Sequence, residues 1–294
     1  MVDDKTPGSR LPDGYRIDQM TREEADILND WATQEGWNPG LSDIDIAWAY
    51  DPDAFIAIRK DDSLAGGGAI IAYGQSAGFM GLFIMRADLR RQGLGRVLWH
   101  ERLRRLRARL KPDAPIGMDG VFDMVPFYEA GGFTYLHRDL RYQGEGGGTC
   151  DAAAIPIDLA SWAALTEYDA RLSGIRRPGF LLGWLNQPCG TGYALMRDDA
   201  LAGYGYIRPC QNGHKIGPLY ADTPAIARRL LDSLLSTIPG EAVSLDVPEP
   251  NAAALRMMTD LGWTQSFGCA RMVNGTAIAC PIDQVFGVTS FEFG

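Results

Sequence analysis

Short apolar runs alternate with amphipathic stretches along the first half of the chain. A strand is predicted around Tyr15–Gln19, and Thr21 with Glu24 forms a capping box at the start of the helix that follows. Further strands are predicted at residues 54–59, 66–74, 77–85, 116–121 and 136–142. Alternation of strands and helices in this order predicts a three-layer α/β domain, with helices on both sides of a mixed central sheet.

The longest predicted helix of this half follows the strand at 77–85. Trp99, Leu103, Leu106 and Leu110 recur at spacings of four, three and four residues, which is typical of the core-facing side of a helix. Arginines flank this apolar stripe. The residues between the strand and the stripe therefore form a strand-to-helix loop.

The second half repeats this outline. Strands are predicted in YALMRD, ALAGYGYIRP, HKIGPLYA and AVSLDVP, and helices in NAAALRMMTDLGW and from Thr223–Pro224 onward. Between the halves, GEGGGT at 144–149 has the composition of a flexible linker. The repeated order of elements predicts a duplicated fold with two domains, residues 1–143 and 150–294.

Composition restricts the classes of protein that fit. Hydrophobic residues make up 46% of the 294 residues and charged residues 22%, as in ordinary globular proteins. No apolar run approaches the roughly 20 residues of a membrane span, and the polar N-terminus does not resemble a targeting leader. The five cysteines and three histidines are scattered, which predicts reduced thiols in a cytoplasmic protein without a metal site. Nothing in the sequence predicts the oligomeric state.

Charge is distributed unevenly along the chain. The net charge of −9 argues against nucleic acid as the main partner. Residues 1–62 hold fifteen acids and six bases, whereas residues 63–111 hold two acids and ten bases. This asymmetry is consistent with two ligands of opposite charge, or with solvated surface charge alone.

The basic region contains an R-x-x-G-x-G pattern formed by Arg90, Gly93 and Gly95. Glycines let the backbone approach a ligand closely, and the first amides of a helix are unpaired donors at the positive end of its dipole. Together with Arg91 and Arg96, they predict an anion site. We call residues 86–96 the arginine loop. The pattern is neither a Walker A loop nor a dinucleotide-binding fingerprint, and the alternative is a helix start with incidental arginines.

These residues resemble a known family. MRADLRRQGLGRVLW resembles motif A of the GNAT superfamily of acyl-CoA N-acyltransferases, except that Met85 and Ala87 replace the usual valine and proline. FYEAGGF at 127–133 resembles the superfamily's Y-x-x-x-G-F segment. EGWNPGLSD, IGPLYAD, LDVPEPN and GVTSFEFG extend the resemblance to bacterial tandem-GNAT proteins, with a second acetyltransferase-like domain. The resemblance implies two GNAT-like domains, each with a mixed sheet flanked by helices.

The resemblance also implies a cosubstrate, acetyl-CoA, bound without a metal. Its pyrophosphate would lie on loop amides at Arg91, Gln92, Gly93, Leu94, Gly95 and Arg96, beside Arg90. Its pantetheine would pair with the strand before the loop near Phe83 and Met85. A backbone N–H near Phe83 could then stabilise the oxyanion that forms during attack.

Two roles in catalysis follow from the same resemblance. Tyr128 is the candidate general acid for the departing thiolate, although a tyrosine here could simply pack against the sheet. The superfamily often places a glutamate base on the strand before the loop, but residues 77–85 contain no acid. Asp119 is the nearest candidate base, followed by Asp123 and Glu35, and each could instead be structural.

The second half is predicted to have lost its cofactor site. IGPLYAD lacks the loop glycines, and Asp222 would repel a pyrophosphate at a helix N-terminus. This half is either a scaffold or one wall of an acceptor pocket. In the second case, it would contribute acids that face an opposite wall from the first half, and the candidates are Asp169, Asp222 and Asp246 facing Glu35, Trp37 and Asn38.

The sequence therefore predicts an acetyl-CoA-dependent N-acetyltransferase that acts on a primary amine, most simply a small molecule. Direct attack in a ternary complex is expected, because no cysteine is expected near the predicted thioester site to carry an acyl intermediate. Two alternatives stay open. One is a non-catalytic acyl-CoA-binding sensor, and the other is an enzyme that acetylates a protein lysine or N-terminus.

Overall fold

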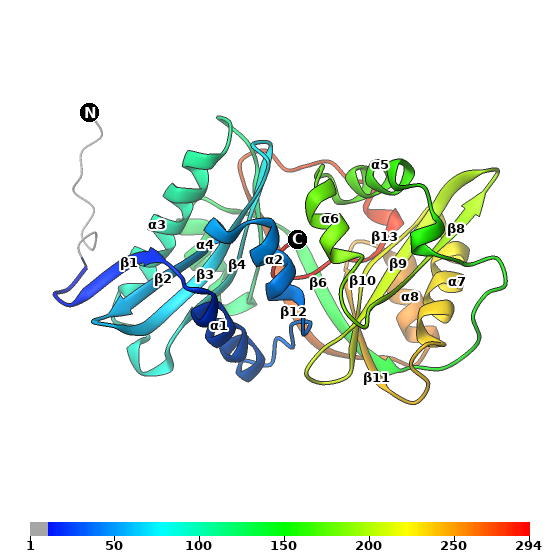
Figure 1. Cartoon of the computed structure of the whole chain (residues 1–294), viewed down its shortest axis with the longest axis horizontal. Coiled ribbons are helices and arrows are strands. Elements are labelled where there is room, and N and C mark those ends of the chain that lie inside the picture. The colour runs from blue at the N-terminus through cyan, green and yellow to red at the C-terminus, as the bar shows by residue number, and fades with distance from the viewer. Residues whose placement is uncertain (1–10) are drawn as a thin grey trace.

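The computed structural model describes residues 11–294, in which thirteen strands form a single mixed sheet with helices packed on it (Figure 1). The elements of the first half are β1 (Tyr15–Gln19), α1 (Arg22–Gln34), α2 (Asp43–Tyr50), β2 (Phe55–Lys60), β3 (Ser63–Tyr73), β4 (Ala77–Met85), α3 (Leu94–Arg109), β5 (Ile116–Gly120), α4 (Val125–Ala130) and β6 (Thr134–Glu145). Those of the second half are β7 (Ile155–Pro156), α5 (Trp162–Ser173), α6 (Pro178–Trp184), β8 (Thr191–Arg197), β9 (Ala200–Pro209), β10 (His214–Ala221), α7 (Pro224–Leu235), β11 (Ala242–Pro248), α8 (Ala252–Asp260), β12 (Thr264–Asn274) and β13 (Val285–Gly287).

Local sequence signals account for the starts of several helices. The predicted capping box is confirmed, since the Thr21 hydroxyl accepts from the Glu24 amide at 3.2 Å and the Glu24 carboxylate accepts from the Thr21 amide at 2.9 Å. The α7 start at Thr223–Pro224 is confirmed as well. The predicted apolar stripe is confirmed, since Trp99 and Leu106 are buried and Leu103 and Leu110 pack against the same cluster. The arginines around it are not all at the surface, because Arg102 of α3 is fully buried.

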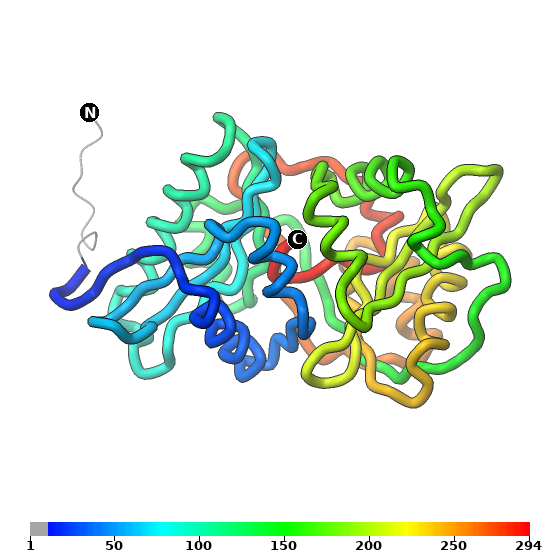
Figure 2. Tube along the Cα trace, in the orientation of Figure 1, coloured from blue at the N-terminus to red at the C-terminus, as the bar shows by residue number. Residues whose placement is uncertain are grey.

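The two halves exchange their last long strands. The strand order is β1-β2-β3-β4-β5-β12-β6-β11-β10-β9-β8-β7, so β12 from the second half pairs with β5 of the first. In turn, β6 from the first half pairs with β11 of the second. The two exchanged strands lie side by side at the centre of the molecule (Figure 2). A cut at residues 144–149 would therefore separate strands that pair with each other.

The parallel strands β4 and β5 pair over a short stretch and then separate. Their pairing is confined to Gly78 with Ile116 and Phe79 with Gly117. Toward Met85 the two strands diverge, which leaves part of the backbone of β4 without a neighbour on that side. Each half has one pair of parallel strands, and the gap between β4 and β5 belongs to the pair of the first half.

The corresponding position of the second half, between β10 and β11, is filled by the chain itself. These strands pair from His214 to Ile216, after which β13 pairs with Leu219 and Tyr220 of β10. The amide of Val288 then donates to the Asp246 carbonyl of β11 at 2.9 Å. The second half therefore holds its own C-terminal strand where the first half has a gap.

Three hydrophobic clusters cover the two faces of the sheet. Successive residues of β2 show the division, since Phe55 belongs to one cluster and Ile56 to another. The first cluster is shared between the halves and lies under α1, α2, α5 and α6. Within it, Phe180 of α6 packs edge-on against Tyr50 and Tyr73, with ring centroids 5.8 and 5.5 Å apart. The remaining clusters lie under α3 and α4, and under α7 and α8.

Two buried ion pairs connect the halves within this shared region. Arg208 of β9 forms a bidentate pair with Asp43 of α2, at 2.7 and 2.9 Å. Arg141 of β6 forms another with Asp246 of β11, at 2.6 and 2.8 Å, and donates to the Trp37 carbonyl at 2.6 Å. In residues 11–294, no helix has both the length and the hydrophobicity needed to cross a bilayer.

Candidate active site

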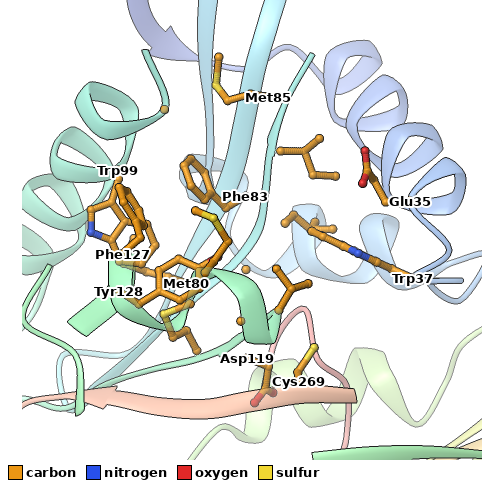
Figure 3. A pocket seen from close by; sticks show the side chains of 18 of the residues that line it. Glu35, Trp37, Met80, Phe83, Met85, Trp99, Asp119, Phe127, Tyr128 and Cys269 are labelled. Carbon is orange, nitrogen blue, oxygen red and sulfur yellow. The ribbon is translucent and has the colours of Figure 1, made fainter. Parts of the chain in front are cut away.

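The gap between β4 and β5 opens into a cavity of about 540 Å³ (Figure 3). Both halves line this cavity, which runs from the arginine loop to the exchanged strand β12 and the C-terminal segment, residues 288–294. Figure 3 shows Tyr128 on one side of the cavity, and Glu35 with Trp37 on the other. The cavity therefore joins the predicted anion site to the junction between the halves.

The arginine loop presents consecutive unpaired N–H groups. The amides of residues 91–95 find no acceptor in the described part of the chain, whereas the Arg96 amide donates to the Gly93 carbonyl at 3.1 Å. Arg91 and Gly93 have positive φ values of 64° and 82°, and successive amides in turns of this kind can form an anion-binding concavity. Because α3 begins at this point, its dipole adds positive potential. The loop can therefore bind an anion with several oxygens, such as a pyrophosphate.

The arginine side chains of the loop differ in their contacts. Arg90 donates to the Met85 carbonyl at 2.9 Å and forms an ion pair with Glu35 across the cavity. Arg91 and Arg96 line the cavity and have no carboxylate partner within residues 11–294. These two guanidinium groups are thus available to a bound phosphate, while Arg90 connects the loop to the opposite wall.

Four other predicted cofactor residues divide into two groups. Phe83 and Met85 of β4 line the cavity. The Gln92 side chain donates to the Asp88 carbonyl at 3.0 Å, and the Leu94 side chain is buried in the core beneath α3. Neither of the latter side chains lines the cavity, so only their backbone amides are available to a ligand.

A bulge bends β4 beside the cavity. Leu82 has a φ of 52°, and the register between β3 and β4 shifts here. From α3, the buried guanidinium of Arg102 donates to the carbonyls of Gly81 and Ala69, each at 2.6 Å. Gly68 leaves the space that this guanidinium occupies. The bulge is therefore held in place by a cation buried beneath the strand.

Among residues 11–294, Arg102 has no carboxylate partner. Its Nε and Nη1 atoms are buried without a hydrogen-bond acceptor, and burial lowers the pKa of Arg102 to about 9. The group is thus still cationic at neutral pH. Tyr128 is close enough to oppose this pKa shift electrostatically. An uncompensated positive charge therefore lies under the part of β4 that faces the cavity.

Tyr128 lies where α4 meets the sheet. The side chain lines the cavity, and its ring packs against Trp99 with centroids 5.0 Å apart. Gly120 at the end of β5 makes room for this ring, since a Cβ there would overlap it. Burial raises the pKa of Tyr128, and the nearby Arg102 opposes the shift. The phenol is therefore protonated at neutral pH and can donate a proton in the cavity.

Asp119 and Asp123, the candidate bases on and after β5, have different surroundings. Asp119 lines the cavity, but its carboxylate accepts from Arg271 of β12 at 2.6 and 2.8 Å. Burial raises the pKa of Asp119 well above its usual range, although Arg271 opposes the shift and Asp139 adds to it. Asp123 is exposed and does not line the cavity. Asp119 stays a prediction, as a carboxyl group already engaged by an arginine.

Cys269 overturns the reason given for direct attack. The exchanged strand β12 brings this buried cysteine to the cavity, beside Asp119 (Figure 3). Burial, followed by the charges of Asp119 and Asp246, raises the pKa of the Cys269 thiol well above its usual value. A protonated thiol is a poor nucleophile, so this environment makes Cys269 a poor carrier of an acyl group, while the expected absence of a cysteine is wrong.

The predicted acceptor residues of the first half lie close together. Glu35 and Trp37 line the cavity. Asn38 does not, because its side chain exchanges hydrogen bonds of 3.0 and 3.1 Å with the backbone of Asn212. Asn38 therefore connects the two halves at their surface.

The acids proposed from the second half do not reach the cavity. Asp246 is buried in its pair with Arg141, and Asp169 in a pair with Arg177. Asp222 accepts from the Tyr168 hydroxyl at 2.9 Å, next to the start of α7. In the described residues, the structure does not bring these three acids to the cavity wall.

Sequence reasoning missed one acid that does line the cavity. Glu292 of the C-terminal segment lines the cavity and is 3% exposed. The signal in the sequence was a single acid between Phe291 and Phe293, inside the segment GVTSFEFG already noted for its resemblance. No group of His, Cys, Asp or Glu side chains within residues 11–294 is arranged to hold a metal ion.

Comparisons with known proteins agree with this geometry. An acetyltransferase (GNAT) family model matches residues 19–133, and an acetyltransferase (GNAT) domain model matches residues 165–287. A holothin acyltransferase from Pseudoalteromonas sp. (strain SANK 73390) is 24% identical over 275 residues, which cover 92% of each chain.

Solved structures show the same fold at low sequence identity. A Pyrococcus horikoshii protein assigned as an acetyltransferase superposes with a TM-score of 0.81 at 20% identity, over 99% of this chain and 100% of its own. A tandem GNAT protein from the clavulanic acid biosynthesis pathway superposes with a TM-score of 0.62 at 14% identity, over 90% and 99%.

Proposed function

Because this chain belongs to the GNAT superfamily of acyltransferases, with two GNAT domains in tandem, we propose that it transfers an acetyl group from acetyl-CoA to a primary amine in the cavity of its first domain. One observation carries the proposal. The unpaired amides of residues 91–95 and the unpaired part of β4 open into the same cavity as Tyr128. The cavity therefore combines an anion site, an unpaired strand backbone and a proton donor. Acyl transfer from a CoA thioester requires these three parts together.

Each part of the cavity has a task in this reaction. The loop amides, Arg91 and Arg96 bind the pyrophosphate, and β4 near Phe83 pairs with the pantetheine. The thioester carbonyl would lie at the bulge that Arg102 holds in place, where backbone N–H groups can polarise it. The amine attacks the carbonyl carbon, the carbon–sulfur bond breaks, and Tyr128 protonates the departing sulfur.

The second domain is proposed to bind no CoA. Its gap between β10 and β11 is filled by β13, and α7 follows β10 after Asp222 and Thr223 alone. The backbone that would pair with pantetheine is therefore already paired. The similarity to a holothin acyltransferase supports a small-molecule acceptor over a protein.

A paired variant tests the arginine loop. Gly93→Asp with Gly95→Asp is expected to weaken acetyl-CoA binding about tenfold or more, roughly 1.4 kcal/mol, because two carboxylates would face the pyrophosphate. An added side chain meets open space at Gly93, although the φ of 82° there strains an L residue, and it makes ordinary contacts at Gly95. The strain falls on the loop, so the rest of the fold should persist. Titration calorimetry of the wild type should show one site per chain.

The matched control is Gly74→Asp, another glycine with positive φ and open space, in the turn between β3 and β4. It should leave binding unchanged. Two sites per chain would contradict the assignment of acetyl-CoA to the first domain, and unchanged affinity in the loop variant would contradict the loop's role. A wild type that binds acetyl-CoA but releases no thiol with any amine of a panel would support a sensor.

A further inference from the structure

The C-terminal segment crosses from the second domain to the strand that forms the acyl-transfer site. It leaves β13 beside β11 and ends where the Tyr73 hydroxyl donates to the Phe293 carbonyl at 2.5 Å. Arg177 donates to the Gly294 carbonyl, also at 2.5 Å. On the way it passes so close to β4 that a Cβ at Gly81 would overlap the backbone of Glu292. Glu292 is therefore held against the bulge of β4.

The carboxylate of Glu292 differs from those of Glu35 and Asp119, the other two acids that line the cavity. Both of its oxygens are buried without a hydrogen-bond partner. By contrast, the buried carboxylates of Asp43, Asp246 and Asp119 each accept two hydrogen bonds from an arginine. Arg208, Arg141 and Arg271 are committed to those pairs. In residues 11–294, no arginine, lysine or histidine nitrogen lies within ion-pair distance of the Glu292 carboxylate, although the charges of Arg141 and Arg208 act on it from farther away.

An unpaired buried carboxylate is costly unless it binds a partner. The rings of Trp37, Phe267 and Phe291 line the cavity together with Glu292. The Arg141 guanidinium lies over the last two, with its Cζ 5.5 and 5.0 Å from their ring centroids. A ligand that fits both the unpaired carboxylate and the aromatic walls carries one positive charge on an otherwise apolar, flat group. The carboxylate binds the charge, and the aromatic walls bury the apolar group.

We propose that Glu292 binds the ammonium group of an apolar, aromatic primary amine and is the base that deprotonates it. This inference rests on the acyl transfer proposed above and names the acceptor class and the missing base. It also explains how β4 can lack an acid, since the second domain supplies one beside Gly81 of that strand.

The proton balance of the step is complete. Glu292 takes one proton from the ammonium, and the free amine forms a bond to the thioester carbonyl carbon. As the carbon–sulfur bond breaks, the thiolate takes the Tyr128 proton, and the phenolate recovers it from the amide nitrogen. Glu292 then releases its proton to solvent.

The test compares a charged ligand with a neutral one of the same shape. Phenethylamine and 2-phenylethanol are titrated by calorimetry into CoA-saturated wild type, Glu292→Gln and Glu129→Gln. The last variant is the matched control, because Glu129 is exposed next to Tyr128 and does not line the cavity. In wild type and control, the amine should bind about ten- to hundredfold more tightly than the alcohol, as a charge-assisted hydrogen bond provides. In Glu292→Gln this preference should disappear, while the Kd of CoA stays constant.

Thermal unfolding separates this role from a structural one. Removing an unpaired buried charge should leave the Tm of Glu292→Gln unchanged or raised. A lowered Tm with the amine preference intact would assign Glu292 to the support of the neighbouring arginines and overturn the proposal, as would a wild type without preference for the amine. Amine preference that depends on Glu292 without thiol release from acetyl-CoA would keep the ammonium site and reject acyl transfer.

Discussion

Tyr128→Phe is expected to lower kcat by about 10²- to 10⁴-fold, the range that a positioned general acid contributes. The hydroxyl has no hydrogen-bond partner within residues 11–294, whereas the ring fills the space beside Gly120 and Trp99. Phenylalanine keeps that packing and removes only the proton donor. Steady-state kinetics should therefore show a large loss in kcat with nearly constant KM for acetyl-CoA and an unchanged Tm.

The pH profile gives a second check on Tyr128. An ordinary tyrosine has a pKa of about 10, and burial raises the pKa of Tyr128 above that value. The phenol therefore keeps its proton at every pH below about 10 and stops acting as an acid only at higher pH. The wild-type kcat should then show no alkaline fall from Tyr128 below about pH 10. Tyr135→Phe is the control, because Tyr135 is exposed on β6 and should lose no activity. A kcat for Tyr128→Phe within tenfold of wild type would show that the tyrosine only packs.

The arginine loop was predictable because its chemistry is local. Its amides, its glycines and the helix that follows lie within residues 86–96, so their geometry depends on nearby backbone and not on distant contacts. The same holds for the capping box at Thr21 and Glu24 and for the strand at 77–85. In each case, a few neighbouring residues determine which backbone groups stay unpaired.

The rest of the cavity depends on pairing between distant segments. Nothing in the local pattern of β12 shows that it pairs with β5 of the other half, so the arrival of Cys269 at the cavity could not be predicted. Glu292 reaches Gly81 across more than 200 residues for the same reason. Arg102 was misread because an arginine among arginines on a helix is usually solvated, and only the carbonyls of the bulge explain its burial.

The junction that builds this cavity rests on the buried pair of Asp43 and Arg208. Both side chains are fully buried, the Asp43 carboxylate also accepts from the Gly40 amide at 2.9 Å, and Arg208 stacks on Trp184 with its Cζ 4.3 Å from the ring centroid. Asp43→Asn should lower the free energy of unfolding by about 3–5 kcal/mol, because it leaves the buried guanidinium uncompensated. Denaturant unfolding at neutral pH measures this loss.

Asp45→Asn is the matched control on the same helix. Asp45 is exposed and paired with Arg22 at the surface, so its loss should cost no more than about 1 kcal/mol. Equal costs for the two variants would show that the Asp43 pair does not hold the halves together.

The difference in the free energy of unfolding between wild type and Asp43→Asn should also depend on pH. Burial acts to raise the pKa of Asp43, but Arg208 outweighs it, so the pKa is lowered in the folded protein. The stability from this pair is therefore present above the unfolded pKa of about 4 and is lost as pH falls through the lower, folded value. The free energies of unfolding of wild type and Asp43→Asn should therefore approach each other only at acidic pH. Because α2 follows directly from the segment that carries Glu35 and Trp37, the variant should also raise the KM of the amine.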